Sequence, residues 1–299
     1  MRPSFLRSLL AMIGTVTALG IAGPPASAEP ILHHVHGLAF APDGKALLVP
    51  AHIGLAIYRD GRWSKAPGPT HDFMGFSAAK NAIYTSGHPA PGSALRNPFG
   101  LMKSTDGGKT WSSLGLLGEA DFHQLAVGYH TSVVYVVNAQ PNSRMPQPGI
   151  YFTADEGKSW NRSESVGLAA QVISIAVHPA ETGTVAVGTL GGLYLSRDFG
   201  ASFKRLGRNS PVTAVLFDFD GKHLYFVRED ADALRRIALD GQNDKTLGLP
   251  RLERDFVLYI AQNPAKPDEL AIATRQRHAF VSTDAGQNWK QIAREGEGL

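Results

Sequence analysis

The sequence contains no cysteine, and this absence excludes two kinds of covalent anchor. No disulfide can staple the fold, and no cysteine can carry a lipid. The chain has 299 residues, which is long enough to bury a sizeable apolar core. The fold must therefore be stabilised by the packing of that core.

Long apolar runs are also scarce. The one clear run extends from Leu9 to Ile21, which is short for a membrane-spanning helix. It follows Arg2 and Arg7 and precedes the small residues Ala26-Ser27-Ala28. This order predicts a secretory signal peptide over residues 1–28, cleaved after Ala28. We therefore expect export to the periplasm or the medium, with no membrane span.

The rest of the chain lacks both a concentrated charge and a helical period. The formal net charge is +3 and the basic residues are scattered, so we expect no nucleic-acid partner. After residue 28 the apolar residues fall in short segments, rich in β-branched and aromatic side chains and bounded by Gly, Pro or Asp. Such segments are typical of strands, so the sequence predicts an all-β protein.

One short motif, Ser/Thr-x-Asp-x-Gly-x-x-aromatic, occurs four times. Its Asp can accept backbone N–H bonds inside a β-turn, its Gly allows a backbone angle that other residues avoid, and its aromatic ring packs back on the turn. We expect these turns to join the third and fourth strands of repeated units and to have no chemical role. The copies are STDGGKTW (Ser104 to Trp111), TADEGKSW (Thr153 to Trp160), SRDFGASF (Ser196 to Phe203) and STDAGQNW (Ser282 to Trp289).

The spacing of the motif predicts the number of units. Asp106, Asp155 and Asp198 are 49 and 43 residues apart, and Asp284 follows after 86 residues, twice 43. Asp240 lies where the missing copy is expected. With a further degenerate copy upstream, this predicts six units and a six-bladed β-propeller with four strands per blade. We place it in one domain, residues 29–299.

The upstream degenerate motif contains Asp60. Each unit repeats the same order of strands. Every unit looks complete in itself, so we expect the ring to close by packing of the first blade on the last. The fourth blade is predicted to have strands at residues 172–179, 184–189, 192–198 and 202–206. The innermost strands of the other blades are predicted to begin near His34, His71, Phe122, Val212 and Phe256.

Seven of the eleven histidines fall on one predicted face, at the upper channel mouth of blades one to three. His34 and His36 alternate along a predicted strand, so their side chains should share a face. Neutral imidazole is a common ligand of copper, zinc and nickel. The pattern predicts a transition-metal site, copper or zinc, whose ligands come from His34, His36, His52, His71, His88 and His123.

Three neighbouring residues bear on that site. Asp72 is placed to orient one imidazole through its second nitrogen. Met74 and Met145 are soft thioethers and would favour copper. The alternatives are that the histidines line a wet channel or contact an organic ligand.

The repeated motif resembles the Asp-box, or BNR repeat, of sialidases and related propellers. The chain also resembles exported bacterial proteins named as glycosyl-hydrolase-like, through HVHGL, HDFMGFS, SGHPAPGS, NPFGLMKSTDGGKTW, DFHQLAVGY and VGTLGGLYLS. More distantly it resembles the photosystem II assembly-factor propellers, which bind protein and catalyse nothing. These resemblances imply the propeller fold and leave the activity open.

The sialidase resemblance implies an arginine cluster, a tyrosine nucleophile and an acidic residue. The candidates here are Asp72, Tyr259, Arg228, Arg275 and Arg277. The first inner strand, HHVHGLAF, has no arginine where the family motif would place one. We therefore expect a monomeric, non-catalytic binding or scaffold protein with a protein or glycan partner. A sialidase-like glycoside hydrolase is the alternative.

Overall fold

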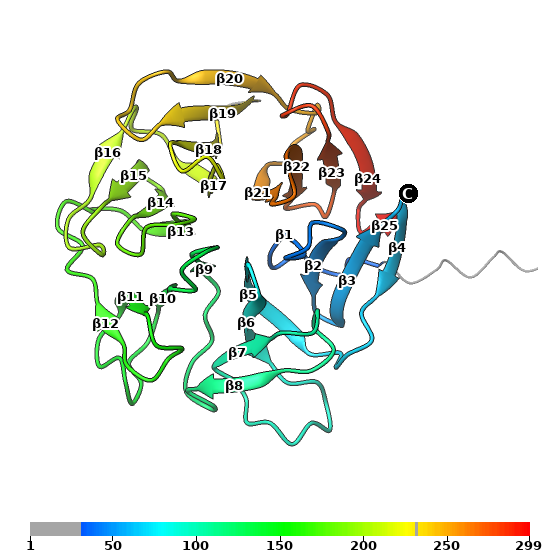
Figure 1. Ribbon diagram of the computed structural model, residues 1–299, viewed down its shortest axis with the longest axis vertical. Helices are drawn as coiled ribbons and strands as arrows, with labels where there is room; N and C mark the ends of the chain where they lie inside the picture. The colour runs from blue at the N-terminus through cyan, green and yellow to red at the C-terminus, as the bar shows by residue number, and fades with distance from the viewer. Residues whose placement is uncertain (1–30, 231–232) are drawn as a thin grey trace, which may run out of the picture.

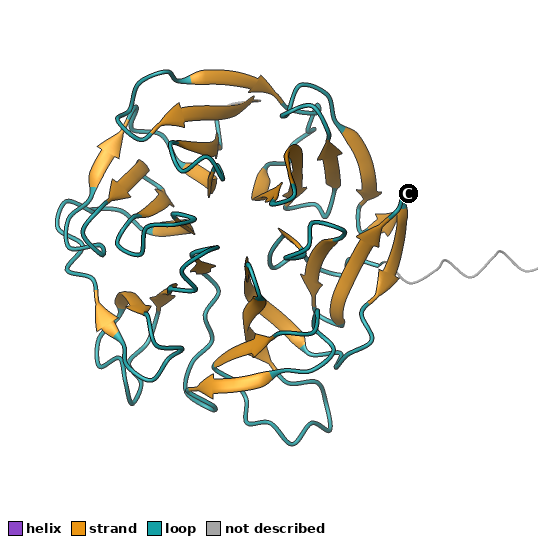
Figure 2. Ribbon diagram, in the orientation of Figure 1, coloured by secondary structure: helices purple, strands orange, loops and turns teal. Residues whose placement is uncertain are grey.

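The computed structural model describes residues 31–230 and 233–299. These residues form six antiparallel sheets arranged as blades around a central axis, with loops and turns between the strands (Figures 1 and 2). The prediction of an all-β, six-bladed propeller is confirmed. The predicted signal peptide, residues 1–28, lies outside the described residues. Within those residues there is no helix long and apolar enough to cross a membrane.

Each of the first three blades is built from four consecutive strands. Blade 1 contains β1 (Ala39–Phe40), β2 (Leu47–Ala51), β3 (Gly54–Arg59) and β4 (Arg62–Lys65). Blade 2 contains β5 (Asp72–Ala79), β6 (Ala82–His88), β7 (Leu101–Ser104) and β8 (Ser112–Gly115). Blade 3 contains β9 (Leu125–Val127), β10 (Val134–Asn138), β11 (Gly149–Thr153) and β12 (Asn161–Arg162).

The remaining blades follow the same order, and the last has a short fifth strand. Blade 4 contains β13 (Val172–Val177), β14 (Val185–Thr189), β15 (Gly192–Ser196) and β16 (Lys204–Leu206). Blade 5 contains β17 (Val212–Phe217), β18 (His223–Arg228), β19 (Ala233–Ala238) and β20 (Lys245–Gly248). Blade 6 contains β21 (Val257–Asn263), β22 (Lys266–Thr274), β23 (Ala279–Ser282), β24 (Lys290–Arg294) and β25 (Glu297–Gly298).

The apolar core is divided into six clusters, and each fills the space between two neighbouring blades. Successive side chains of a strand point to opposite faces of its sheet, so every blade contributes to the clusters on both of its sides. One cluster joins Leu47 and Val49 of blade 1 to Ala271 and Ala273 of blade 6. The ring therefore closes by packing, as expected, and within residues 31–230 and 233–299 no strand is exchanged between these blades.

Polar contacts support the same closure. The backbone N–H of Leu32 donates to the carbonyl of Gly296 at 2.9 Å. The indole N–H of Trp63, in β4, donates to the carbonyl of Ile292, in β24, at 2.7 Å. Both bonds join segments from opposite ends of the chain, which lie side by side in Figure 1.

The four Asp-box motifs form turns between the third and fourth strands, as predicted. In blade 2, the Asp106 carboxylate accepts bonds from the Ser104 hydroxyl at 2.8 Å, the Thr110 N–H at 3.0 Å and the Thr110 hydroxyl at 2.6 Å. The Gly108 N–H donates to the Ser104 hydroxyl at 2.9 Å, and its φ of 89° requires glycine. All of these partners lie within four residues of Asp106, so the turn is specified locally.

The two degenerate motifs occupy the predicted position with different turns. Asp60 and Gly61 form a two-residue hairpin between β3 and β4, with φ of 50° and 77°. Positive φ at both residues is the type I′ pattern, for which Asp-Gly is a preferred sequence. Asp240 accepts one bond, from the Gln242 N–H at 2.8 Å. These turns keep the blade spacing without the full Asp-box network.

Two inner strands begin later than predicted. That of blade 3 begins at Leu125 and not near Phe122, and that of blade 1 begins at Ala39 and not near His34. Gly37 lies against Pro50, since a Cβ at Gly37 would meet the Pro50 ring at 3.0 Å. Proline has no N–H to donate, so Pro50 bonds this segment through its carbonyl, which accepts the His36 N–H at 3.2 Å, and the regular pairing of β1 with β2 starts at Ala39. The segment with His34 and His36 therefore lies before the strand.

Candidate functional site

Three histidines of blade 1 gather on the upper face, where the innermost strands begin. His34 and His36 precede β1, and His52 lies in the turn between β2 and β3. The ring centroids of His34 and His52 are 4.1 Å apart, and those of His36 and His52 are 4.8 Å apart. Within this group the rings are tilted by at most 15° from parallel. The structure brings these three side chains together, although residues 34–36 are not a strand.

Asp72, the first residue of β5, brings a carboxylate from blade 2 to the same place. Its Oδ1 lies 4.0 Å from His36 Nε2 and 3.8 Å from His52 Nε2. Both separations are too long for hydrogen bonds. Asp72 Oδ1 and His36 Nε2 are shielded from solvent and have no hydrogen-bond partner among the described residues. Unpaired buried polar atoms are rare in folded proteins and mark places where an ion, a water or a ligand belongs.

A second group lies beside the first, between blades 2 and 3. Asp121 Oδ2 is 3.2 Å from His88 Nε2 and 2.7 Å from His123 Nε2. The opposite nitrogen of His88, Nδ1, is 2.6 Å from Asn97 Oδ1, which fixes the orientation of the ring. Asp121 and Asn97 were not predicted as site residues. Asp121 precedes β9 much as Asp72 begins β5, and this parallel is the signal that could have identified it.

The surroundings lower the pKa of two histidines in the first group and raise the pKa of one histidine in the second. Burial, followed by the neighbouring His52, lowers the pKa of His36 to about 4. Burial also lowers the pKa of His34. By contrast, the hydrogen bond to Asp121 raises the pKa of His123. At neutral pH His36 therefore offers a free lone pair, and the Asp72 carboxylate next to it gains no positive charge from that ring.

Three residues that the sequence placed at the site lie elsewhere or turn away. His71 is buried, its Nδ1 accepts the Ala90 N–H at 3.0 Å, and its ring packs on Phe73 and Phe99. Met145 is fully buried in the apolar cluster between blades 2 and 3. Met74 is also buried, two residues after Asp72 in β5.

The residues considered for a hydrolase do not gather around one point. Arg228 is 2% exposed, with its guanidinium 4.8 Å from the Phe226 ring. Tyr259 packs against the cluster between blades 6 and 1, and burial raises its pKa to about 12. The exposed Arg275 lies over the Phe256 ring, and Arg277 Nη1 is 3.4 Å from the carbonyl of His33.

A further polar cluster, on the lower side of blade 5, is satisfied internally. Asp218, Asp220 and His223 could together offer ligand atoms to a metal. Arg236 already occupies the space between the carboxylates, with Nη2 at 2.7 Å from each of them. His223 Nδ1 is 2.6 Å from Asp220. We interpret this cluster as a structural ion-pair network.

The histidines stand at one end of the central channel. The channel has a volume of about 200 Å³, and the inner strands of all six blades line it. His36 and His123 belong to its wall at the upper mouth. Any ion or small molecule held by the histidines would therefore face the channel.

Comparison with known proteins supports the repeat and the fold. The BNR/Asp-box repeat family matches residues 102–113, which contain the first of the four motifs. A search of curated protein sequences finds no match.

Solved structures resemble the ring as a whole. A GH74 enzyme of Niastella koreensis matches with a TM-score of 0.59 and 14% identity, over 89% of this chain and 46% of its own. An ancestral GH74 enzyme matches with a TM-score of 0.54 and 14% identity, over 89% of this chain and 39% of its own. This chain thus spans less than half the length of either enzyme.

A chain of a nidogen/laminin complex matches with a TM-score of 0.60 and 10% identity, over 83% of this chain and 92% of its own. Structural similarity at such low sequence identity indicates a shared fold and does not indicate a shared activity. The molecule is thus a six-bladed β-propeller that carries the Asp-box repeat and shares its fold with GH74 enzymes.

Proposed function

We propose that this protein is an exported binding or scaffold protein that holds a divalent transition metal, zinc or copper, at the upper mouth of its channel. The ligands are His36, His52 and Asp72, with His34 as the fourth. One observation carries the proposal: Asp72 Oδ1 and His36 Nε2 are buried and unpartnered while facing each other at 4.0 Å. A cation between them would satisfy both atoms at once.

The distances suit a small ion after a modest contraction. Tetrahedral zinc with nitrogen and oxygen ligands at about 2.0–2.2 Å separates those ligands by about 3.3–3.5 Å. The separations from Asp72 to the two imidazole nitrogens are 3.8 and 4.0 Å. The rings are nearly parallel, so their in-plane lone pairs do not converge. Binding therefore requires the rings to turn about the Cβ–Cγ bond, which is a soft torsion in histidine.

The ligand chemistry favours a borderline divalent ion. Three imidazoles and a carboxylate suit Zn²⁺ or Cu²⁺. The thioether that would select Cu⁺ is not supplied by Met145, which is buried in an apolar cluster. Asp121 and His123 stand next to the site and can bind or orient a water on the metal.

The test is elemental analysis of untagged protein purified without chelators, followed by calorimetric titration with zinc and with copper. We expect one equivalent of metal, and a His36→Ala, His52→Ala double variant that binds neither ion. The matched control is His130→Ala, because His130 is exposed and lies on the opposite face, after β9. Equal affinity in the wild type and the double variant would refute the assignment.

A glycoside hydrolase is the competing function, and one feature favours it: Asp72 and Asp121 stand at the same mouth, beside neighbouring histidines. A pair of carboxyl groups is the usual machinery of glycoside cleavage. Turnover of fluorogenic sialosides or aryl glycosides that disappears in Asp72→Asn and in Asp121→Asn would replace the binding function with this one.

A further inference from the structure

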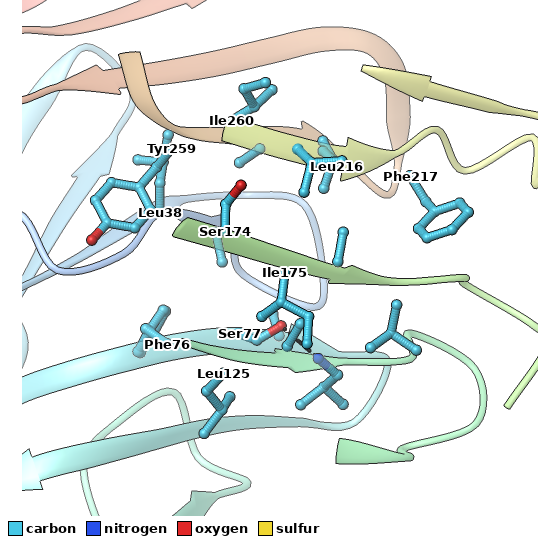
Figure 3. A pocket seen from close by; sticks show the side chains of 18 of the residues that line it. Leu38, Phe76, Ser77, Leu125, Ser174, Ile175, Leu216, Phe217, Tyr259 and Ile260 are labelled. Atoms are coloured by element: carbon cyan, nitrogen blue, oxygen red, sulfur yellow. Dashed lines mark hydrogen bonds between the residues drawn. The ribbon is translucent and has the colours of Figure 1, made fainter. Parts of the chain in front are cut away.

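The channel below the histidines is a chamber with apolar side chains on its wall. Aliphatic residues of the inner strands, such as Ile175, Leu216 and Leu258, line it and remain partly exposed to it. Figure 3 shows Leu38, Phe76, Ile175, Leu216 and Ile260 around the same space. The inner edges of the innermost strands also face the lumen, so backbone groups alternate with these side chains.

Two polar side chains at the wall are already bonded to protein. Ser77 Oγ accepts the Val127 N–H at 3.1 Å. The Gln262 amide binds the Phe219 N–H, Asp218 and the Pro267 carbonyl. An ordered water needs two to four polar partners, and these side chains have little capacity left to hold one. Ser174 Oγ and His36 Nε2 at the same wall are buried without a partner among the described residues.

The lower end of the channel is crossed by Tyr129. Its hydroxyl donates to the Pro42 carbonyl of blade 1 at 3.1 Å, and its ring lies edge-on to Phe219 of blade 5 at 4.8 Å. Tyr129 itself follows β9 in blade 3. A residue of blade 3 can touch blades 1 and 5 together only across the axis. The chamber is therefore narrowed at the bottom, and its other end lies at the histidines.

We propose that the chamber binds a small amphipathic carboxylate, with its apolar body against the aliphatic wall and its carboxylate on the metal at the mouth. The head-group half of this inference rests on the proposed metal site. Asp72 and Asp121 would repel an anion, so the carboxylate needs the cation to bind. The proposed binding of the apolar body rests on the chamber itself. The channel volume of about 200 Å³ exceeds the roughly 150 Å³ of an apolar cavity that binds benzene, so the channel has room for a body of that size.

The probe is octanoate, titrated into zinc-loaded and metal-free protein, with 1-octanol as a ligand that shares the body and lacks the charge. The readouts are calorimetry and the methyl NMR signals of the isoleucines and leucines. We expect octanoate to bind the zinc-loaded protein and to shift the methyl signals of Ile175, Leu216 and Ile260. In metal-free protein octanoate should bind at least about tenfold more weakly, while 1-octanol binds both forms alike.

A channel-filling variant tests the location. Leu216→Trp should weaken octanoate at least about tenfold and leave zinc affinity unchanged, since Leu216 is not a ligand. Leu190→Trp is the matched control, because Leu190 is 53% exposed in the turn between β14 and β15 and does not line the channel. The wild-type methyl shifts decide the matter if Leu216→Trp does not fold.

The outcomes separate the two proposals. Zinc binding without octanoate binding, or octanoate shifts confined to the outer surface, overturns the inference while the metal site stands. Absence of zinc binding refutes the proposed function and the head-group assignment. In that case 1-octanol shifts at Ile175 and Leu216 support the chamber, and their absence overturns it as well.

Discussion

The aspartates of the Asp-box turns and Asp72 at the upper mouth differ in how many hydrogen bonds their carboxylates accept. In each Asp-box, the carboxylate accepts a hydroxyl or amide group and a backbone N–H from its own turn, as Asp155 does with Ser159 at 2.6 and 2.9 Å. These bonds lower the pKa of Asp106, Asp155, Asp198 and Asp284 to about 2. Asp72 Oδ1 is buried and has no such donor in the part of the chain that the structure describes. A satisfied carboxylate fixes a turn, whereas an unsatisfied one leaves an interaction for a ligand.

The largest expected effect follows from removing the unsatisfied carboxylate. Asp72→Asn should lower zinc affinity at least about 100-fold, because loss of even an outer-shell partner costs 10–100-fold. The metal-free variant should melt at the same temperature as the wild type or higher, since a partly buried carboxylate with an unpartnered Oδ1 is gone. Calorimetric titration and thermal unfolding measure the two quantities. Lower stability with unchanged zinc affinity would show that Asp72 is structural.

A second variant removes a carboxylate whose hydrogen bonds are satisfied, in an Asp-box turn. Asp106→Ala should lower the melting temperature, because the Thr110 and Ser104 donors lose their acceptor, and zinc affinity should not change. Asp240→Ala is the internal comparison: Asp240 accepts a single bond, so its loss should matter less. Thermal unfolding of both variants gives the order. A larger effect at Asp240 would contradict the turn account.

Acid should expose the same difference. The Asp-box carboxylates have a pKa of about 2, below the ordinary 3.8, so their ionised form stabilises the fold above pH 3.8. That contribution is lost as the pH falls through about 2. Denaturant unfolding of metal-free protein between pH 5 and pH 2 should show stability falling across this window. The stability of the Asp106→Asn variant should fall less steeply with pH. A slope identical to that of the wild type would argue against a role for the Asp106 network.

The smallest effect is expected at the floor of the channel. Tyr129→Phe removes one part-buried bond to the Pro42 carbonyl and should cost about 1 kcal/mol in the free energy of unfolding. Zinc affinity should stay the same, since Tyr129 lies at the end opposite the histidines. Denaturant unfolding measures the change, and altered zinc binding would indicate that the two ends are coupled.

The site was predictable in part. The clustering of His34, His36, His52, His88 and His123 at one mouth followed from their positions at the start of inner strands and in upper loops. The place of His71 did not follow, because neighbouring residues of one segment can turn to opposite sides. His71 packs on Phe73 and Phe99, and only the core of blade 2 decides this. Asp121 was missed because its role depends on His88, which another blade supplies.

The sequence by itself determined the all-β class, the six blades and the Asp-box turns. The physical reason is range: each box is closed by partners within four residues, as in Ser282 to Asn288. The tertiary structure alone decided where His36 lies relative to Asp72, how His88 meets Asp121, and how Tyr129 crosses the axis. Those contacts join different blades, and their geometry exists only once the blades have packed into a closed ring.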